Sequence, residues 1–279
     1  MNRIEVPGGH IAYAAAGVGA PPVVLLHAGY VDHRMYEREI AHLAQRTSVV
    51  APDARTHGQS STAMAPFRHC DDLAALVREV GGPAVLVGTS MGAGTAVDTA
   101  LEHPELVRAL VISGAGTNEP VFEDAEALEL LARQNEAIAR QDVAAWLRAT
   151  LEWVAGPDRT LHDVDPAVRA KVAGMHEDFV RMHIRPGIVP PDHVAGSWDR
   201  LGEIAVPVLG IVGELDFGDH HRMTARAVES VQDGRGVVWI PGSGHYPNLE
   251  QPEAWEQAID AFLDDALAAE PAGSSPARP

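Results

Sequence analysis

The chain has 279 residues, with 39 acidic against 21 basic side chains and a formal net charge of -18 at pH 7. Nucleic acids and anionic membrane surfaces require clustered basic residues, so this charge argues against both as partners. A hydrophobic content of 46% excludes a mostly disordered chain. Cys70 is the one cysteine, which excludes an internal disulfide. Residues 1–10 do not combine a basic region with a following apolar stretch, and no long apolar run occurs elsewhere. We therefore expect a cytoplasmic protein without a membrane span.

Short apolar runs alternate with longer segments of helical periodicity along most of the chain. The runs are continuously apolar, which is typical of strands that are covered on both faces of a parallel sheet. The alternation therefore predicts an open α/β sheet with helices on both sides. The predicted strands are 23–27, 48–52, 84–87, 110–112, 208–212 and 237–240. The predicted helices are 34–45, 71–80, 91–103, 223–231 and 252–267.

Residues 117–201 break this alternation, because they contain helical segments separated by glycine and proline but no convincing strand. Asp165 before Pro166 marks one helix start, since a carboxylate suits the N-cap and proline suits the first helical position. We predict a helical lid at 117–201, inserted in a core formed by residues 1–116 and 202–269. Residues 270–279 lack apolar periodicity and predict a disordered tail.

The pentapeptide Gly88-Thr89-Ser90-Met91-Gly92 lies between a predicted strand and a predicted helix. A Gly-x-Ser-x-Gly string alone is common by chance, so its position is what makes it informative. A sharp strand-to-helix turn strains its central residue and needs small residues two positions before and after it. The pattern therefore indicates a nucleophile elbow with Ser90 as the candidate nucleophile.

A serine nucleophile needs a base, and the base needs an orienting carboxylate. His245 and Asp216 fit these roles, because each follows a predicted strand and the carboxyl ends of parallel strands share one sheet edge. The chain order Ser, Asp, His is the one expected for this architecture. The alternative carboxylates, which follow the preceding strand of the sheet, are Glu119, Glu123 and Asp124.

Backbone N–H groups of Gly29 and Met91 are the candidate oxyanion donors. Gly29 lies in the turn after a predicted central strand, and Met91 opens the helix after the elbow. Loss of one such donor typically lowers the rate by roughly a hundredfold to a thousandfold.

The candidate substrate-binding residues are the aromatic side chains Tyr30, Trp146, Trp153 and Tyr246. Trp146 and Trp153 are two helical turns apart, so they share one face of a predicted lid helix. Packing of the lid onto the core is the simpler interpretation of that face. The alternative is an apolar pocket beneath the lid.

His220 and His221 form the densest histidine cluster, beside Asp216 and Asp219. We interpret both as solvated residues at a helix start, because adjacent residues point in different directions and no spaced ligand motif accompanies them. No metal or cofactor is expected. His27 is interpreted as a structural partner of its own turn.

These motifs together resemble the α/β-hydrolase family from about Ile4 to Leu267. The other matching segments are His27-Ala28-Gly29, Pro52-Asp53-Ala54-Arg55-Thr56-His57-Gly58-Gln59-Ser60, Gly213-Glu214-Leu215-Asp216 and Gly244-His245. The resemblance implies the α/β-hydrolase fold, with a mostly parallel eight-stranded sheet flanked by helices and a helical cap inserted after the sixth strand. Ala28 and Thr56 depart from the family, which usually has glycine there, and Tyr36 stands where tryptophan is common.

We expect a serine hydrolase of the carboxylesterase or lactonase kind. It would cleave a small, largely apolar carboxylic ester, thioester or lactone through an acyl-enzyme intermediate. The same residues also suit C–C bond hydrolysis, hydroxynitrile lysis or cofactor-free perhydrolase and haloperoxidase chemistry, and a ligand-binding receptor is a further alternative. The expected partner is a small-molecule substrate, and a homodimer is one assembly that the sequence allows.

Overall fold

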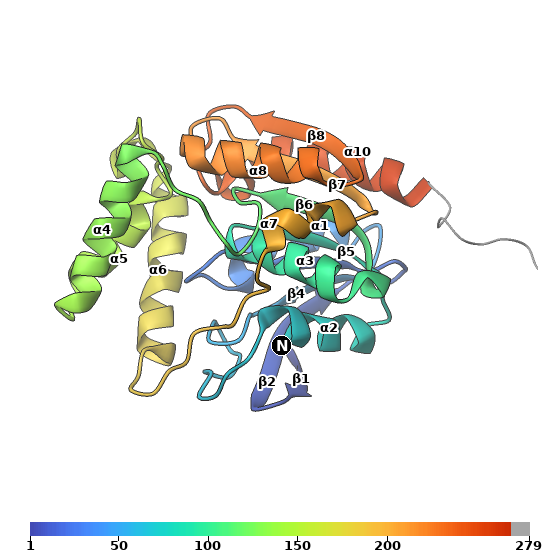
Figure 1. The fold of residues 1–279 in the computed structure, drawn as a ribbon, viewed down its shortest axis with the longest axis horizontal. Helices are drawn as coiled ribbons and strands as arrows, with labels where there is room; N and C mark the ends of the chain where they lie inside the picture. The colour runs from blue at the N-terminus through green and yellow to red at the C-terminus, as the bar shows by residue number, and fades with distance from the viewer. Residues whose placement is uncertain (269–279) are drawn as a thin grey trace, which may run out of the picture.

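The computed structural model describes residues 1–268, which form a sheet of eight strands with helices on both faces (Figure 1). The strand order is β1-β2-β4-β3-β5-β6-β7-β8. The pairs β1/β2 and β2/β4 are antiparallel, and the other neighbours are parallel. This arrangement confirms the predicted α/β fold class.

The strands are β1 (Asn2–Val6), β2 (Gly9–Ala16), β3 (Val23–Leu26), β4 (Val49–Pro52), β5 (Ala84–Thr89), β6 (Val107–Ser113), β7 (Pro207–Gly213) and β8 (Asp233–Ile240). The α-helices are α1 (Glu37–Leu43), α2 (His69–Glu79), α3 (Met91–Glu102), α4 (Ala125–Ala139), α5 (Val143–Glu152), α6 (Pro166–His183), α7 (Ser197–Arg200), α8 (Gly218–Ser230), α9 (Pro247–Glu250) and α10 (Pro252–Ala268). Short 3-10 turns are η1 (His33–Tyr36), η2 (Pro104–Leu106), η3 (Leu161–Asp163) and η4 (Leu201–Glu203).

Strand β3 shows why the central strands are continuously apolar. Val23 and Leu25 pack in the core on the face covered by α1 and α10. Val24 and Leu26 pack in the core on the opposite face, with α2, α3 and α8. Side chains alternate between the two faces of a strand, so burial of both faces requires an apolar residue at every position.

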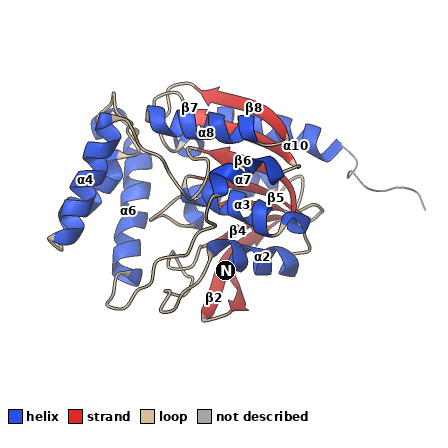
Figure 2. Ribbon diagram, in the orientation of Figure 1, coloured by secondary structure: helices blue, strands red, loops and turns tan. Residues whose placement is uncertain are grey.

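Helices α4, α5 and α6 are inserted between β6 and β7 and stand beside the sheet rather than on either of its faces (Figures 1 and 2). Helix α6 begins at the predicted place, where Asp165 accepts a hydrogen bond from the Ala167 N–H at 2.7 Å and Pro166 occupies the first position. The assignment of residues 117–201 as a separate lid stays a prediction. The predicted tail at residues 270–279 lies outside the described residues.

Within residues 1–268, no helix combines the length and the apolar character that crossing a bilayer requires.

Candidate active site

Ser90 lies at the turn between β5 and α3, with φ 53° and ψ -115°. Non-glycine residues rarely adopt a positive φ, so the elbow holds its serine in a strained conformation. The Ser90 N–H donates to the Ser113 carbonyl oxygen at 2.7 Å, which ties the turn to β6. Glycine is required nearby: a Cβ on Gly88 would lie 2.3 Å from the Gly92 carbonyl oxygen, and one on Gly92 would lie 2.1 Å from that of Leu26.

His245 and Asp216 meet beyond the carboxyl ends of β8 and β7. Nδ1 of His245 and Oδ2 of Asp216 are 2.9 Å apart, and both side chains are buried. The His245 ring lies over Gly114, where a Cβ would be 2.9 Å from its Cε1 atom. Gly114 directly follows Ser113, so the ring lies beside the elbow. Within residues 1–268 the Ser90 hydroxyl has no hydrogen-bond partner, and catalytic hydrogen bonds often tighten only once substrate binds.

Among the described residues, none of the three alternative carboxylates forms a hydrogen bond with His245, and two of them have other partners. Glu119 accepts hydrogen bonds from Gly196 and Ser197. Asp124 accepts one from the Asp219 N–H and forms an ion pair with Arg222. The Glu123 backbone N–H donates to Asp219. Asp216 is therefore the carboxylate that the fold brings to His245.

The second oxygen of Asp216 is also fully used. Oδ1 accepts the Phe217 N–H at 2.8 Å and lies 2.8 Å from Nδ1 of His220. Burial raises the pKa of Asp216, but the His220 and His245 imidazoles outweigh it and hold the pKa well below its ordinary range. Asp216 is therefore a carboxylate anion that two histidines share.

The interpretation of His220 as a solvated residue was wrong, because its side chain is buried against Asp216. Helix α8 begins at Gly218, earlier than predicted, and this start places His220 one helical turn beyond Asp216. Its neighbour His221 points elsewhere, and its Nε2 lies 2.8 Å from the Gly213 carbonyl oxygen.

Gly29 and Met91, the two candidate oxyanion donors, lie side by side. A Cβ on Gly29 would be 4.0 Å from the Met91 Cβ atom. The Gly29 N–H makes no hydrogen bond to any residue in the described part of the chain. Met91 is the first residue of α3, and N–H groups in the first turn of a helix have no intrahelical partner. Both N–H groups are thus available to an oxyanion.

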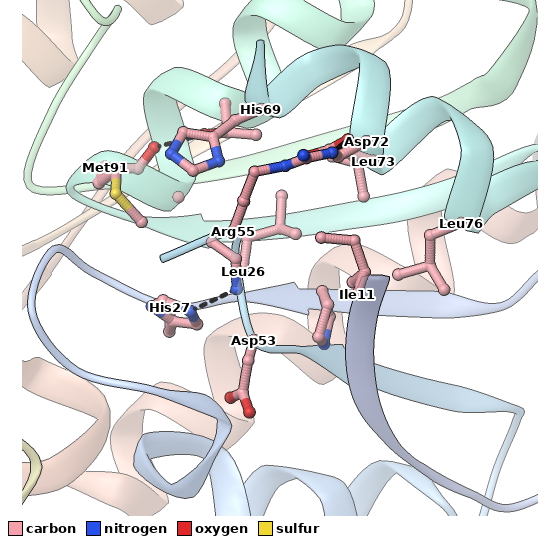
Figure 3. Close-up of a pocket in the computed structure, with 14 residues that line it drawn as sticks. Ile11, Leu26, His27, Asp53, Arg55, His69, Asp72, Leu73, Leu76 and Met91 are labelled. Atoms are coloured by element: carbon pink, nitrogen blue, oxygen red, sulfur yellow. Dashed lines mark hydrogen bonds and ion pairs between the residues drawn. The ribbon is translucent and has the colours of Figure 1, made fainter. Parts of the chain in front are cut away.

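His27 fixes the turn that carries Gly29 through two hydrogen bonds. The Ala54 N–H donates to Nε2 of His27 at 2.9 Å, so Nδ1 must carry the proton that is donated to the Ala28 carbonyl oxygen at 2.7 Å. Figure 3 shows the His27 contact to the backbone beside Arg55. His27 therefore has the structural role that was predicted for it.

A cavity of about 830 Å³ opens in front of the elbow, and Ser90, Gly29, Met91 and His220 all line it. Most of its other walls are apolar or aromatic, with Tyr30, Phe67, Phe122, Ile138, Phe179, Ile188, Val189 and Met223 among them. No aspartate or glutamate of residues 1–268 is among its lining residues. The cavity therefore differs sharply from the strongly acidic chain as a whole.

The cavity wall also lacks an unpaired cation among the described residues. Arg55 lines it, but its guanidinium donates two hydrogen bonds to Asp72, at 2.7 and 2.6 Å. Figure 3 shows the Arg55 side chain directed at Asp72 on α2. Burial lowers the pKa of His57 well below its ordinary value and that of His69 to about 3, so these two of the four histidines that line the cavity are neutral.

Of the four predicted substrate-binding residues, Tyr30 lines the cavity. Trp146 stands behind it, with ring centroids 4.9 Å apart. Trp153 packs against His220 at 5.5 Å, and Tyr246 is buried beside His245 at 5.2 Å. These three side chains do not line the cavity, and the substrate-binding role of Tyr30 stays a prediction. The prediction missed the wall residues of 188–191, which belong to an irregular segment without a periodic signal.

Asp216, His220 and His245 are close enough to share a metal ion, as are Asp32, His33 and Asp53. In both groups, however, the short contacts join carboxylate oxygens to histidine Nδ1 atoms. Hydrogen bonds between ionised carboxylates and imidazole N–H groups account for these contacts. We assign no metal to either group.

The model of the alpha/beta hydrolase family matches residues 23–258. A 2-(acetamidomethylene)succinate hydrolase of Mesorhizobium japonicum is 26% identical over 285 residues, which cover 94% of this chain and 95% of that protein. A 3-oxoadipate enol-lactonase of Acinetobacter baylyi is 23% identical over 268 residues, covering 90% and 92%. The structure of a thermophilic esterase from Thermogutta terrifontis matches with a TM-score of 0.73 and 26% identity, covering 95% of this chain and 99% of that chain.

Proposed function

Because this chain belongs to the alpha/beta hydrolase family, we propose that it is a serine hydrolase of neutral, largely apolar carboxylic esters, thioesters or lactones. The observation that carries the proposal is the buried His245–Asp216 hydrogen bond of 2.9 Å, beside a serine held at positive φ on the elbow. An imidazole oriented by a carboxylate is what a serine hydroxyl needs in order to act as a nucleophile.

In the proposed reaction, the Ser90 oxygen attacks the acyl carbon while Nε2 of His245 takes the hydroxyl proton. Asp216 holds the His245 Nδ1–H and stabilises the imidazolium. The N–H groups of Gly29 and Met91 donate to the negative oxygen of the tetrahedral intermediate. Collapse passes the proton to the leaving alcohol or thiol and acylates Ser90. Water, deprotonated by His245, then releases the acid and restores the serine.

The charge of the cavity wall supports a neutral substrate. The cavity offers apolar and aromatic surface, the neutral histidines His57 and His69, and an Arg55 that Asp72 already neutralises. A carboxylate moved from water into such a site without a partner loses several kcal/mol. By contrast, the Mesorhizobium relative is named for a succinate, which is a dicarboxylate. We therefore propose that this chain prefers uncharged acyl and leaving groups.

The first experiment tests the nucleophile with a fluorophosphonate, followed by intact-protein mass spectrometry. We expect one adduct on the parent protein and none on Ser90→Ala. Ser113→Ala is the matched control, because Ser113 is a buried serine at the end of the neighbouring strand, and its hydroxyl has no partner within residues 1–268. This control should label like the parent. Unchanged labelling of Ser90→Ala would reject the nucleophile.

The second experiment compares 4-nitrophenyl butanoate with the 4-nitrophenyl monoester of succinate, which keeps a free carboxylate. We expect kcat/KM to be about 100-fold higher for the neutral ester, because the charged acyl group must be desolvated without a partner. Equal or reversed preference would contradict the neutral-substrate proposal while leaving Ser90 as nucleophile.

The third experiment adds a β-diketone and a peroxide-dependent halogenation assay to the same preparation. Ester hydrolysis should dominate. Negligible esterase turnover together with strong activity in either of the other assays would replace ester hydrolysis by C–C cleavage or perhydrolysis.

A further inference from the structure

We propose that His220 is a positioning residue for His245: it shares the Asp216 carboxylate and so limits how strongly that carboxylate favours a protonated His245. The proposal rests on the proposed function of Ser90 and His245. It adds a fourth side chain, one that touches the proposed base and its carboxylate.

The contacts of Asp216 are divided between its two oxygens. Oδ2 lies 2.9 Å from Nδ1 of His245, whereas Oδ1 accepts the Phe217 N–H and contacts Nδ1 of His220, both at 2.8 Å. Two contacts on Oδ1 fix the rotation of the carboxylate, so Oδ2 stays aimed at His245. A carboxylate with a freely rotating end would leave the imidazole with a less defined direction.

The position of the protons follows from the chemistry of the acceptor. An ionised carboxylate can only accept hydrogen bonds, so the Nδ1 atoms of both histidines carry protons. Two positive imidazolium rings beside each other repel, so only one of the two histidines carries a second ring proton, and thus a positive charge, at a time. Burial lowers the pKa of His220, which makes it the neutral partner. His220 therefore donates a hydrogen bond to the Asp216 carboxylate while staying neutral itself.

The rings of His220 and His245 are also stacked, with centroids 4.2 Å apart and an interplanar angle of 26°. This stack fixes the plane of His245, in addition to the direction set by Asp216. When His245 accepts the Ser90 proton, its positive charge lies against a neutral aromatic ring, which is a favourable contact.

The other groups around His220 do not compete for its Nδ1–H. Phe122, Trp153 and Phe217 surround the ring from the neighbouring segments and carry no charge. Asp219, on the same helix, accepts the backbone N–H groups of Glu123 and Asp124 and forms an ion pair with Arg222. Asp124 binds Arg222 as well. Asp216 is thus the carboxylate that contacts His220.

The key experiment measures kcat/KM against pH for His220→Phe, which keeps an aromatic ring but removes the N–H. The full Asp216 charge would then act on His245 and favour its protonated, inactive form. We expect the acid limb of the profile to move to higher pH by about 0.5 to 1 unit. We also expect kcat to fall about tenfold with KM within about twofold, because the substrate-binding wall keeps its shape.

Two further variants make the test specific. His220→Gln retains an N–H donor within reach of Asp216 and should bring the acid limb back towards the parent position. His221→Phe is the matched control, because His221 is the adjacent histidine on α8 but contacts the Gly213 carbonyl and the Trp239 ring instead. Its pH profile should coincide with that of the parent.

A purely structural role would lower activity without moving the acid limb, and that result would overturn the proposal. Parent-like kinetics of His220→Phe would overturn it too. If His220→Phe folds poorly, the decision passes to parent protein with ¹⁵N-labelled histidine. Comparison with labelled His220→Gln should assign one downfield Nδ1–H signal to His220, in addition to those of His245 and of His33, which faces Asp53. Absence of a downfield signal from His220 contradicts a shared carboxylate. Labelling of Ser90 is scored separately, so failure of this inference is distinguishable from failure of the proposed function.

Discussion

At the residue scale, Tyr36 joins two central strands just before the elbow. Its hydroxyl donates to the Leu26 carbonyl oxygen at 3.1 Å, and it lies 2.8 Å from Thr89 Oγ1. A phenol has one proton, so the Thr89 hydroxyl is the donor in the second contact. Leu26 and Thr89 end β3 and β5, directly before the turns that carry Gly29 and Ser90. Tyr36 thus fixes the spacing of these two turns.

We predict that Tyr36→Phe lowers the free energy of unfolding by about 1 to 3 kcal/mol, because it leaves the Leu26 carbonyl and the Thr89 hydroxyl without this partner in a fully buried site. Urea unfolding measures the change. Tyr13→Phe serves as the control, since Tyr13 is half-buried in β2 and its hydroxyl bonds to no residue among those described. A Tyr36→Phe protein as stable as the control would show that the hydroxyl contributes nothing.

Individual residues differed in how far the sequence could place them. Ser90 was predictable because a local backbone rule requires glycine on both sides of it. The approach of His245 to Asp216 followed from the strand order of a parallel sheet. His220 was missed, because its contact depends on where α8 begins, and Gly218 offers no clear start signal. A difference of about one helical turn in where α8 begins therefore decides whether His220 is buried.

At the element scale, the antiparallel strands β1 and β2 were not among the strands read from apolar runs. Their side chains are partly exposed, so they lack a continuous apolar run. The central strands were predictable because burial on both faces requires a continuous run of apolar residues. Helix α6 was found from its cap, where Asp165 and Pro166 act locally.

We predict that Gly174→Ala stabilises the protein by about 0.5 to 1 kcal/mol. Gly174 lies inside α6, where glycine costs conformational entropy, and a Cβ there would meet no other described residue within 4 Å. Gly92→Ala is the opposite case, because its Cβ would collide with the Leu26 carbonyl oxygen at 2.1 Å. Thermal unfolding of both variants should give shifts of opposite sign. A destabilised Gly174→Ala would contradict the open space seen beside α6.

At the scale of the whole molecule, His176 links acid sensitivity to the packing of α6 against the core. Both of its ring nitrogens are buried, and neither has a hydrogen-bond partner in the part of the chain that the structure describes. Its ring lies beside those of Tyr30 and Trp146, with centroids 6.5 and 6.4 Å away. Burial lowers the pKa of His176 to about 4.

We predict that His176→Phe reduces the loss of stability on acidification. The unfolded chain binds the His176 proton near its ordinary pKa of 6.5, whereas the folded protein binds it only near 4. Acid therefore favours the unfolded state between these values, by about 2 kcal/mol at about pH 5. Urea unfolding at about pH 7 and about pH 5 should give a smaller difference for the variant by that amount. Equal differences in the two proteins would contradict a neutral buried His176.

Overall charge and composition could not reveal how charge is distributed around the cavity. A chain of net charge -18 surrounds a cavity without acidic lining residues in its described part. Part of the wall comes from residues 188–191, an irregular segment between α6 and α7 whose path depends on tertiary contacts. The fold class and the proposed nucleophile were therefore accessible from the sequence, whereas the substrate surface required the structure.

The uncharged cavity has a consequence for how a turnover would end. Hydrolysis of a neutral ester creates a carboxylic acid, which ionises at neutral pH, so the reaction itself produces the kind of group that the wall cannot hold. Departure of the acid then restores its hydration, and the surrounding negative charge opposes its return. In the proposed enzyme, the chemical step thus supplies the driving force for product release, and accumulated acid should inhibit only weakly.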